Sequence, residues 1–459
     1  MVWFPAGRDA EAQGLVDDVV RLLRDRLADQ QPGLGRSLGE RQLRDALDQS
    51  ITTNGLGAAE ALRRFSEVIA PNCLTIDHPL YLAFVPDAPS HASTLADVLV
   101  SVWNMYPGTF ADGSGAVVAE NQALEWLAEL AGLPTGAGGV FVSGGTAGNL
   151  SALLAARYRW RTRANGALDR THGILLASEG AHASVEAAAH VMDADIVTVP
   201  SDARGRLSRH ALGETIASLG PMHRPRVFAL VATAGTTNAG TVDDLTAAAD
   251  AAEHLGTWLH VDGAYGGAAL LAPSVRDRFA GIERCDSVII DPHKWLFAPF
   301  DSCALVYRDP SVARDAHTQH AAYLEPTQWR AEWNPSDFAH HLTRRARGLP
   351  FWFGLAAYGT EAYAAAVEDN LRLAVETAEM VRKRAGLELV MDPELSVVLI
   401  RRLGWGADEY RQWSDRTAAA GLGYVTPTTW RGETVIRLCF VNPATRVDDI
   451  RWLLDSLSA

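Results

Sequence analysis

Seven short apolar segments alternate with helical patterns between residues 139 and 307 of this 459-residue chain. The apolar segments are residues 139–142, 174–177, 196–200, 227–233, 258–262, 287–290 and 303–307, and the helical stretches between them include 146–161, 182–192, 208–219 and 243–255. Strands that are apolar along nearly their whole length and alternate with helices are typical of a parallel sheet covered by helices on both faces. The pattern therefore predicts an α/β protein with a mostly parallel, seven-stranded sheet.

Polar or glycine-rich segments follow five of the predicted strands. They are residues 143–149, 179–184, 232–237, 262–267 and 291–295. Each alone has an ordinary structural explanation, such as a tight turn, a helix cap or a surface lysine. Because parallel strands bring their carboxyl ends to one edge of a sheet, we expect the five segments to converge on one site.

Lys294 and Asp262 are the residues on which the expected chemistry depends. Lys294 follows the strand pattern 287–290, where burial would lower its pKa and make the amine a nucleophile toward an aldehyde. Asp262 ends its strand and could keep a pyridine nitrogen protonated, so that the ring accepts carbanion charge. The turn 143–149 opens a helix whose free N–H groups suit a phosphate, but it has neither the lysine of a Walker loop nor the spacing of a dinucleotide fingerprint.

The regions outside the sheet have patterns of their own. In residues 9–30, leucine and valine recur at helical spacing, which predicts an amphipathic helix that packs on the rest of the protein or on a second subunit. Residues 308–349 have weak periodicity, and long connections of this kind are often active-site lids. A helical pattern over 350–385 is followed by strand patterns at 395–401 and 434–441 and a helical pattern at 446–457.

These patterns predict three parts. We expect an N-terminal helical segment over residues 1–88, a large domain over 89–349 with a lid loop at about 308–343, and a small C-terminal α+β domain over 350–459.

Composition excludes several classes of protein. The formal net charge is −14 and no basic tract is interleaved with aromatic residues, so neither nucleic acid nor a membrane is an expected partner. The cysteines at 73, 285, 303 and 439 form no Cys-x-x-Cys pair, so we expect neither a zinc site nor a disulfide framework. The chain has no signal-peptide pattern and no apolar run of about 18 residues, which predicts a cytoplasmic protein.

The five segments resemble those of the pyridoxal-5′-phosphate (PLP)-dependent group II amino-acid decarboxylases, which include the aromatic-L-amino-acid, histidine and glutamate decarboxylases. The resemblance extends to residues 78–86, 344–347 and 437–443, so that it covers roughly residues 70–445. It implies the aspartate-aminotransferase type of fold (PLP fold type I) and a homodimer with the active site at the subunit boundary. The N-terminal helix would then clasp the partner subunit.

The resemblance also implies a role for each matching residue. Lys294 would hold PLP as a Schiff base, Asp262 would pair with the ring nitrogen, and His182 would stack on the ring. These three would be the catalytic residues. The remaining contacts with the cofactor would come from Ala264 on the other ring face, from Thr237, and from Gly145, Thr146, Ser287 and His293 around the phosphate.

Two positions depart from the family pattern. Many members have asparagine at the position of Asp291, and because a carboxylate would repel a phosphate, we expect Asp291 to point elsewhere or to be held by a neighbour. Aromatic decarboxylases use a lid tyrosine to protonate the reaction intermediate, and we expect that position to fall near residues 333–336, where this chain has Trp333 and no tyrosine. His340 and His341 are possible substitutes.

The predicted reaction is decarboxylation of an L-amino acid to the amine and carbon dioxide. Phe84, Trp103 and Tyr106 lie in segments that line the pocket in the family, which favours an aromatic or apolar side chain, although they are equally well explained as core aromatics. Three alternatives stay open: a decarboxylation-dependent aldehyde synthase, suggested by the lid; a PLP-dependent carbon–carbon lyase of the sphingosine-phosphate type; and a catalytically silent homologue.

Overall fold

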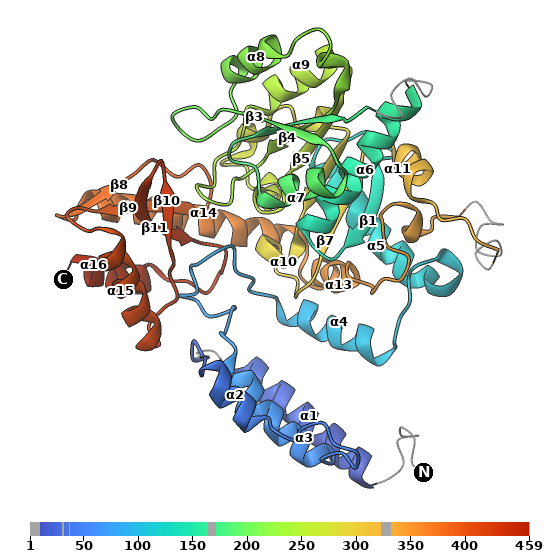
Figure 1. Cartoon of the computed structure of the whole chain (residues 1–459). Coiled ribbons are helices and arrows are strands. Elements are labelled where there is room, and N and C mark those ends of the chain that lie inside the picture. The colour runs from blue at the N-terminus through green and yellow to red at the C-terminus, as the bar shows by residue number, and fades with distance from the viewer. Residues whose placement is uncertain (1–9, 30–31, 36, 164–170, 323–331, 459) are drawn as a thin grey trace.

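A seven-stranded sheet lies at the centre of the computed structural model, which describes residues 10–29, 32–35, 37–163, 171–322 and 332–458 (Figure 1). Its strands are β1 (Gly138–Val142), β2 (Ile174–Ser178), β3 (Asp195–Val199), β4 (Val227–Thr233), β5 (Trp258–Asp262), β6 (Ser287–Ile290) and β7 (Cys303–Tyr307). The order is β1-β7-β6-β5-β4-β2-β3, in which β7 runs antiparallel to both of its neighbours and all other pairs are parallel. The predicted mostly parallel sheet is confirmed.

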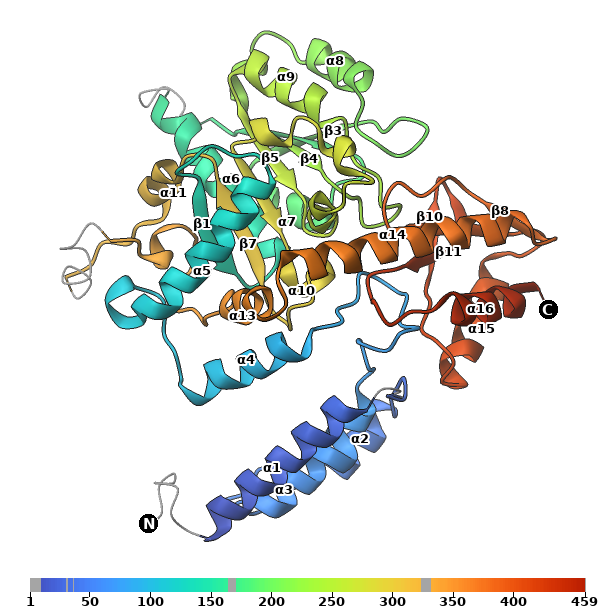
Figure 2. The ribbon, with the colours of Figure 1, turned by 180° about the vertical axis from the view of Figure 1, so that it is seen from behind.

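Helices cover both faces of the sheet, because successive strand residues belong alternately to two apolar clusters. In β1, Phe141 belongs to one cluster and its neighbours Val140 and Val142 to the other. The first cluster includes residues of α5 (Phe110–Leu130), α8 (Arg209–Ser218) and α9 (Leu245–Leu255), and the second includes residues of α6 (Gly145–Arg163), α7 (Ala183–Val191) and α11 (Pro310–His317). Figure 1 shows α6 and α7 in front of the sheet, and Figure 2, from behind, shows α5 in front of it.

The C-terminal part contains a second sheet, which is antiparallel. Its order is β10-β11-β9-β8, with β8 (Leu387–Leu389), β9 (Val397–Arg402), β10 (Pro427–Trp430) and β11 (Glu433–Cys439), and it packs with α14 (Thr360–Arg382), α15 (Ala407–Ala419) and α16 (Val447–Ser458). The sequence patterns predicted β9 and β11 but missed β8 and β10, which are short and mostly only partly buried. The single helix expected over 350–385 is two, because Gly359, with φ of 76°, separates α13 (Leu349–Tyr358) from α14.

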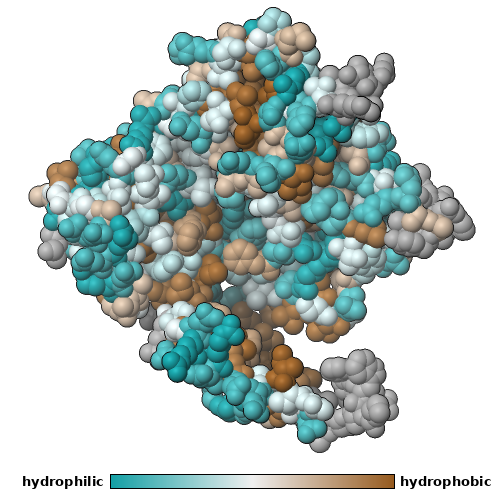
Figure 3. Space-filling view, viewed as in Figure 1, coloured by the Kyte–Doolittle hydropathy of each residue, from teal (hydrophilic) through white to brown (hydrophobic). Residues whose placement is uncertain are grey.

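The N-terminal helices project from the body of the protein. They are α1 (Ala10–Ala28), α2 (Glu40–Ala46) and α3 (Ala58–Arg64), followed by helical turns at Phe65–Ile69 and Ala70–Asn72, and they lie beyond α4 (His91–Val102) in Figures 1 and 2. Large apolar side chains are exposed on both parts: Val16, Val19, Val20, Phe65 and Ile69 on the N-terminal helices, and Leu95, Leu99 and Val102 on α4. Figure 3 shows apolar surface where the N-terminal helices face the body.

Short helical turns connect the remaining elements. They are Arg224–Arg226, Gly266–Leu271, Arg276–Phe279, Ile282–Arg284, Pro335–Asp337 and the one-turn helix α10 (Pro292–Trp295). Within the described parts of the chain, no helix is both long enough and apolar enough to cross a bilayer. The four cysteines are free thiols, and only Cys73 is exposed.

Candidate active site

A cavity of about 300 Å³ lies at the carboxyl ends of the parallel strands. Residues from all five polar segments line it, because β1, β2, β4, β5 and β6 run in the same direction and end at this edge. Of the residues expected to bind the cofactor, the structure brings together Gly145, Thr146, His182, Thr237, Asp262, Ala264, His293 and Lys294. A cavity of this size is at the lower end of the range that holds small ligands and cofactors.

Asp262 ends a chain of hydrogen bonds that starts deep in the sheet. The Trp258 indole N–H donates to the Ser287 hydroxyl oxygen (2.7 Å), so that the hydroxyl can donate to Nδ1 of His260 (2.8 Å). Nε2 of His260 then donates to the side-chain oxygen of Asn149 (2.8 Å), whose amide donates to Oδ2 of Asp262 (3.0 Å). Every donor in this chain points toward the carboxylate, so the hydrogen bonds can reinforce one another.

Burial keeps the middle of this chain neutral. His260 is completely buried, and burial lowers its pKa to about 4, although Asp262 acts in the opposite direction. At neutral pH its ring therefore has one proton, and the Ser287 donor places that proton on Nε2. Sequence reasoning assigned no role to Asn149 or His260. Both residues lie in segments that the sequence analysis had selected. The sequence did not show that the His260 side chain points from β5 toward Asn149 of α6.

His182 is joined to the same network through Ser184. Nδ1 of His182 accepts hydrogen bonds from the Ser184 backbone N–H (3.2 Å) and hydroxyl (2.8 Å), and this caps the first turn of α7. The Ser184 hydroxyl oxygen accepts from Asn149 (2.8 Å). Asn149 thus fixes the position of both Asp262 and His182, which is what a rigid binding site needs from residues behind its lining.

Ser287 does not lie in the cavity, contrary to its expected role at a phosphate. It is the first residue of β6, paired with His260, and is fully buried. Its hydroxyl is already engaged by Trp258 and His260. The turn Ser143–Thr146 at the start of α6 does line the cavity, and a Cβ on Gly145 would lie 3.4 Å from the Ala264 methyl. Free N–H groups at this helix start suit a phosphate.

Lys294 is held by Asp291. The two side chains form an ion pair with an Nζ–Oδ2 distance of 3.0 Å, and Asp291 is buried. The expectation that Asp291 is held by a neighbour is met, but it does face the cavity. Burial lowers the pKa of Lys294, yet attraction by Asp291 and Asp262 outweighs burial and the pKa is raised. The expected lowering was therefore wrong, because sequence reasoning counted burial and not the neighbouring carboxylates.

None of the three aromatic residues expected at the substrate pocket lines this cavity. Phe84 and Trp103 are largely exposed, and the Tyr106 hydroxyl lies 3.5 Å from the Leu342 carbonyl oxygen. Phe84 has a positive φ of 54°, and its carbonyl oxygen accepts a hydrogen bond from Arg437. Within the described chain, Phe300 is the phenylalanine that lines the cavity, with its ring centroid 5.0 Å from that of His293.

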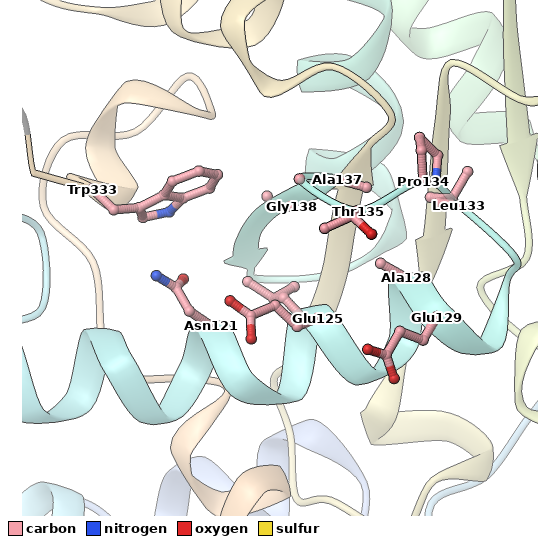
Figure 4. A pocket seen from close by; sticks show the side chains of 13 residues that line it. Asn121, Glu125, Ala128, Glu129, Leu133, Pro134, Thr135, Ala137, Gly138 and Trp333 are labelled. Atoms are coloured by element: carbon pink, nitrogen blue, oxygen red, sulfur yellow. The ribbon is translucent and has the colours of Figure 1, made fainter.

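Trp333, at the position expected for the lid residue, lies away from the active-site cavity of its own chain. Trp333 stacks on Phe338 and contacts Gly138 at the amino end of β1, whereas the active-site cavity lies at the carboxyl ends of the strands. There it lines a separate cavity of about 330 Å³ with Asn121 and Glu125 of α5 (Figure 4). Residues 333–336 therefore do not line the active-site cavity of the same chain.

The two histidines suggested as substitute acids do not reach the site either. His340 contacts Ser151, and neither His340 nor His341 lines the active-site cavity. Burial lowers the pKa of both, that of His341 to about 3. The single tyrosine in the expected lid loop, Tyr323, lies outside the described residues.

The fold and the site together define a PLP-dependent enzyme. The residues present fit the cofactor: an amine at Lys294, a carboxylate at Asp262, and a glycine-rich helix start for the phosphate all face one cavity. Residues 41–402 match the family model described as the pyridoxal-dependent decarboxylase conserved domain, so the chain belongs to this family. It is a carboxy-lyase that acts on an amino acid with pyridoxal phosphate.

Relatives and solved structures agree with this assignment. The chain is 30% identical to an aromatic-L-amino-acid decarboxylase of Bacillus atrophaeus, over 91% of this chain and 88% of the relative. It is 31% identical to an L-2,4-diaminobutyrate decarboxylase of Rhizobium meliloti, over 91% of this chain and 85% of the relative. The TDC of Oryza sativa, solved with PLP and tryptamine, has the same fold, with a TM-score of 0.91 at 24% identity, covering 99% of this chain and 98% of that chain.

Replacing Asn149 tests the hydrogen-bond chain behind Asp262. Asn149→Leu removes a charge-assisted donor and leaves Asp262 less well fixed, so we expect the affinity for PLP to fall by about 10- to 100-fold. The affinity is measured by titrating the apoenzyme with PLP. Asn370→Leu is the matched control, since this buried asparagine contacts Trp295 and Asn442 outside the cavity. An equal loss of affinity in both variants would show that Asn149 acts only through stability.

Replacing Asp291 tests the charge state of Lys294. Asp291→Asn removes the ion-pair partner, so the amine should lose its proton at lower pH, and only the unprotonated amine attacks an aldehyde. We expect the pH profile for the rate of PLP capture by the apoenzyme to move to lower pH. Asp301→Asn is the control, because Asp301 lines the same cavity but pairs with Arg347. A profile that does not move would contradict this account of the lysine.

Proposed function

We propose that Lys294, Asp262 and His182 carry out the decarboxylation of an L-amino acid in the cavity at the strand ends. When bound, PLP accepts the electron pair that remains on Cα as carbon dioxide leaves. The observation that supports the proposal is that Lys294 and Asp262 line one cavity, with Asp262 held by donors on both carboxylate oxygens.

Each residue of the cavity has a definite task in this proposal. The Asp262 carboxylate holds a proton on the ring nitrogen of the cofactor, and Lys294 anchors the cofactor between turnovers. His182, with Nδ1 occupied by Ser184, presents its carbon face or Nε2 to the cavity. The phosphate is held by Gly145 and Thr146 at the start of α6, with Thr237, Ala264 and His293 completing the cofactor contacts.

Removing the Lys294 amine is the direct test. Lys294→Ala should abolish carbon dioxide release and the absorbance of lysine-bound PLP, because no other amine lies in the described lining of the cavity. Carbon dioxide release is measured over the twenty amino acids together with ornithine, 2,4-diaminobutyrate and DOPA. Full activity of the variant would refute the role of Lys294, and no release from any amino acid by the wild-type protein would favour a silent homologue.

The aldehyde synthase is the second candidate function. Residues 333–336, where the lid residue is expected, include no tyrosine that could return a proton to Cα. A carbon–carbon lyase has no further support in the cavity.

Measuring the products of the wild-type protein distinguishes the two functions. A decarboxylase releases one amine for each carbon dioxide without consuming oxygen, whereas an aldehyde synthase consumes oxygen and releases aldehyde and hydrogen peroxide. Amine, aldehyde and oxygen uptake are measured together. If the wild-type protein already consumes oxygen and releases aldehyde, the chain is an aldehyde synthase.

We also propose that the enzyme is a cytoplasmic homodimer. Val16 and Val20 on α1 and Leu95 and Leu99 on α4 expose apolar side chains. This exposure supports a second subunit that covers them. Sedimentation as a monomer at micromolar concentration would contradict the dimer.

The choice of amino acid is the finer question. Phe84, Trp103 and Tyr106 do not line the cavity of the described chain, so the lining does not support the preference for an aromatic or apolar side chain that was expected from them. Relatives of similar identity are named for aromatic amino acids, 2,4-diaminobutyrate and histidine, so family membership does not select among them.

A further inference from the structure

Asp87 is a buried carboxylate that no basic side chain of the described residues neutralises. It is 2% exposed, and no side chain in the described chain donates a hydrogen bond to either carboxylate oxygen. Burial, and to a lesser extent the nearby Asp77, raises its pKa well above the usual range, and the backbone of Ala88 offsets this only in part. An unpaired buried carboxylate destabilises a fold, and this marks Asp87 as a candidate for binding a ligand.

The segment that contains Asp87 is fixed at one end to Arg437, which also contacts Thr237, and at the other end to Phe297, three residues after Lys294. On one side, Arg437 donates to the Phe84 carbonyl oxygen (2.5 Å) and to the carbonyl oxygen of Thr237 (2.9 Å), which lines the active-site cavity. On the other side, the backbone N–H of Ser90 donates to the carbonyl oxygen of Phe297 (2.9 Å). Asp87 lies midway between these anchors, and this segment is therefore held beside the site.

Asp87 lines a second cavity, of about 750 Å³, which shares Phe300 with the lining of the active-site cavity. Pro299 and Phe300 give this second cavity apolar surface. Its charged groups are Asp29, Asp77, Asp87 and Arg26, with His91 also in the lining, and Arg26 is already paired with Asp77 at 2.5 Å. The surroundings of Asp87 are thus net acidic and suit a cation.

We infer that Asp87 is the counter-charge for a substrate whose side chain ends in an ammonium group. The α-amino and carboxylate groups would lie by Lys294, the side-chain methylenes would pass Phe300, and the terminal ammonium would meet Asp87. This inference rests on the proposed decarboxylase function and names its substrate class: L-amino acids with a second, aliphatic amine. The ammonium supplies the charge and the donors that Asp87 lacks in the described chain.

Matched substrates that differ only in charge test the inference on the holoenzyme. 2,4-Diaminobutyrate is compared with norvaline, and ornithine with norleucine, because each pair exchanges an ammonium for a methyl group. We expect the wild-type enzyme to prefer at least one diamino acid, and Asp87→Asn to lower kcat/KM for that substrate by about 100-fold while changing the neutral partner by less than about threefold. Asp408→Asn, the same change at an exposed residue of α15, should leave kcat/KM unchanged for both substrates of each pair.

A binding measurement keeps the test independent of turnover. The diamine 1,3-diaminopropane should raise the Tm of the wild-type enzyme more than butylamine does, and the difference should vanish in Asp87→Asn. Wild-type decarboxylation of neutral or aromatic amino acids with no preference for a diamino acid would overturn the inference and leave the proposed function standing. An equal loss of kcat/KM for all substrates in Asp87→Asn would also overturn the inference, because this result is expected if Asp87 only supports the fold or pairs with a second subunit. Failure of every amino acid to release carbon dioxide would instead refute the proposed function itself.

Discussion

The hydrogen bonds that converge on Asp262 are the interaction on which the rest of the site depends. A carboxylate in a buried cavity remains charged only if donors compensate for the water it has lost, and here Asn149 and the backbone N–H of Ala264 each donate to one of its oxygens. Asn149 is aligned by His260, which burial keeps neutral, and His260 is aligned by Ser287. The electrostatics of the cavity are therefore set from within the sheet, several residues behind the surface that a ligand touches.

The topology of the sheet explains why this network can reach Asp262 at all. Residues of β5 and β6 stand side by side in parallel register, so that His260 faces Ser287 and Asp262 faces Ile289. The same parallel direction brings α6, with Asn149 one turn from its start, over the strand ends. The arrangement that creates an open edge for the cavity thus also supplies the buried groups that hold its charged residue.

Sequence patterns predicted the sheet and most of the cavity lining, because both follow from local signals: apolar runs, helix starts and polar residues at strand ends. They failed where the outcome depends on which way a side chain points or on what else is nearby. Ser287 was placed at a phosphate although its hydroxyl faces Trp258, and the pKa of Lys294 was expected to fall although Asp291 raises it. Asn149 and Asp87 were missed for the same reason, since nothing in the sequence shows that their side chains are buried or what those side chains face.

Asp262 and Asp87 show how the same chemical group gains different roles from its surroundings. Both are almost fully buried, at 5% and 2% exposure. Asp262 has donors from the protein on both oxygens, so its position is fixed before any ligand arrives and suits a permanent partner such as a cofactor ring. Asp87 receives no side-chain donor within the described chain, and burial raises its pKa well above the usual range, so a cation that approaches it stabilises its ionised form. A carboxylate of the second kind responds to each arriving molecule, and that is the property a residue needs in order to select among substrates.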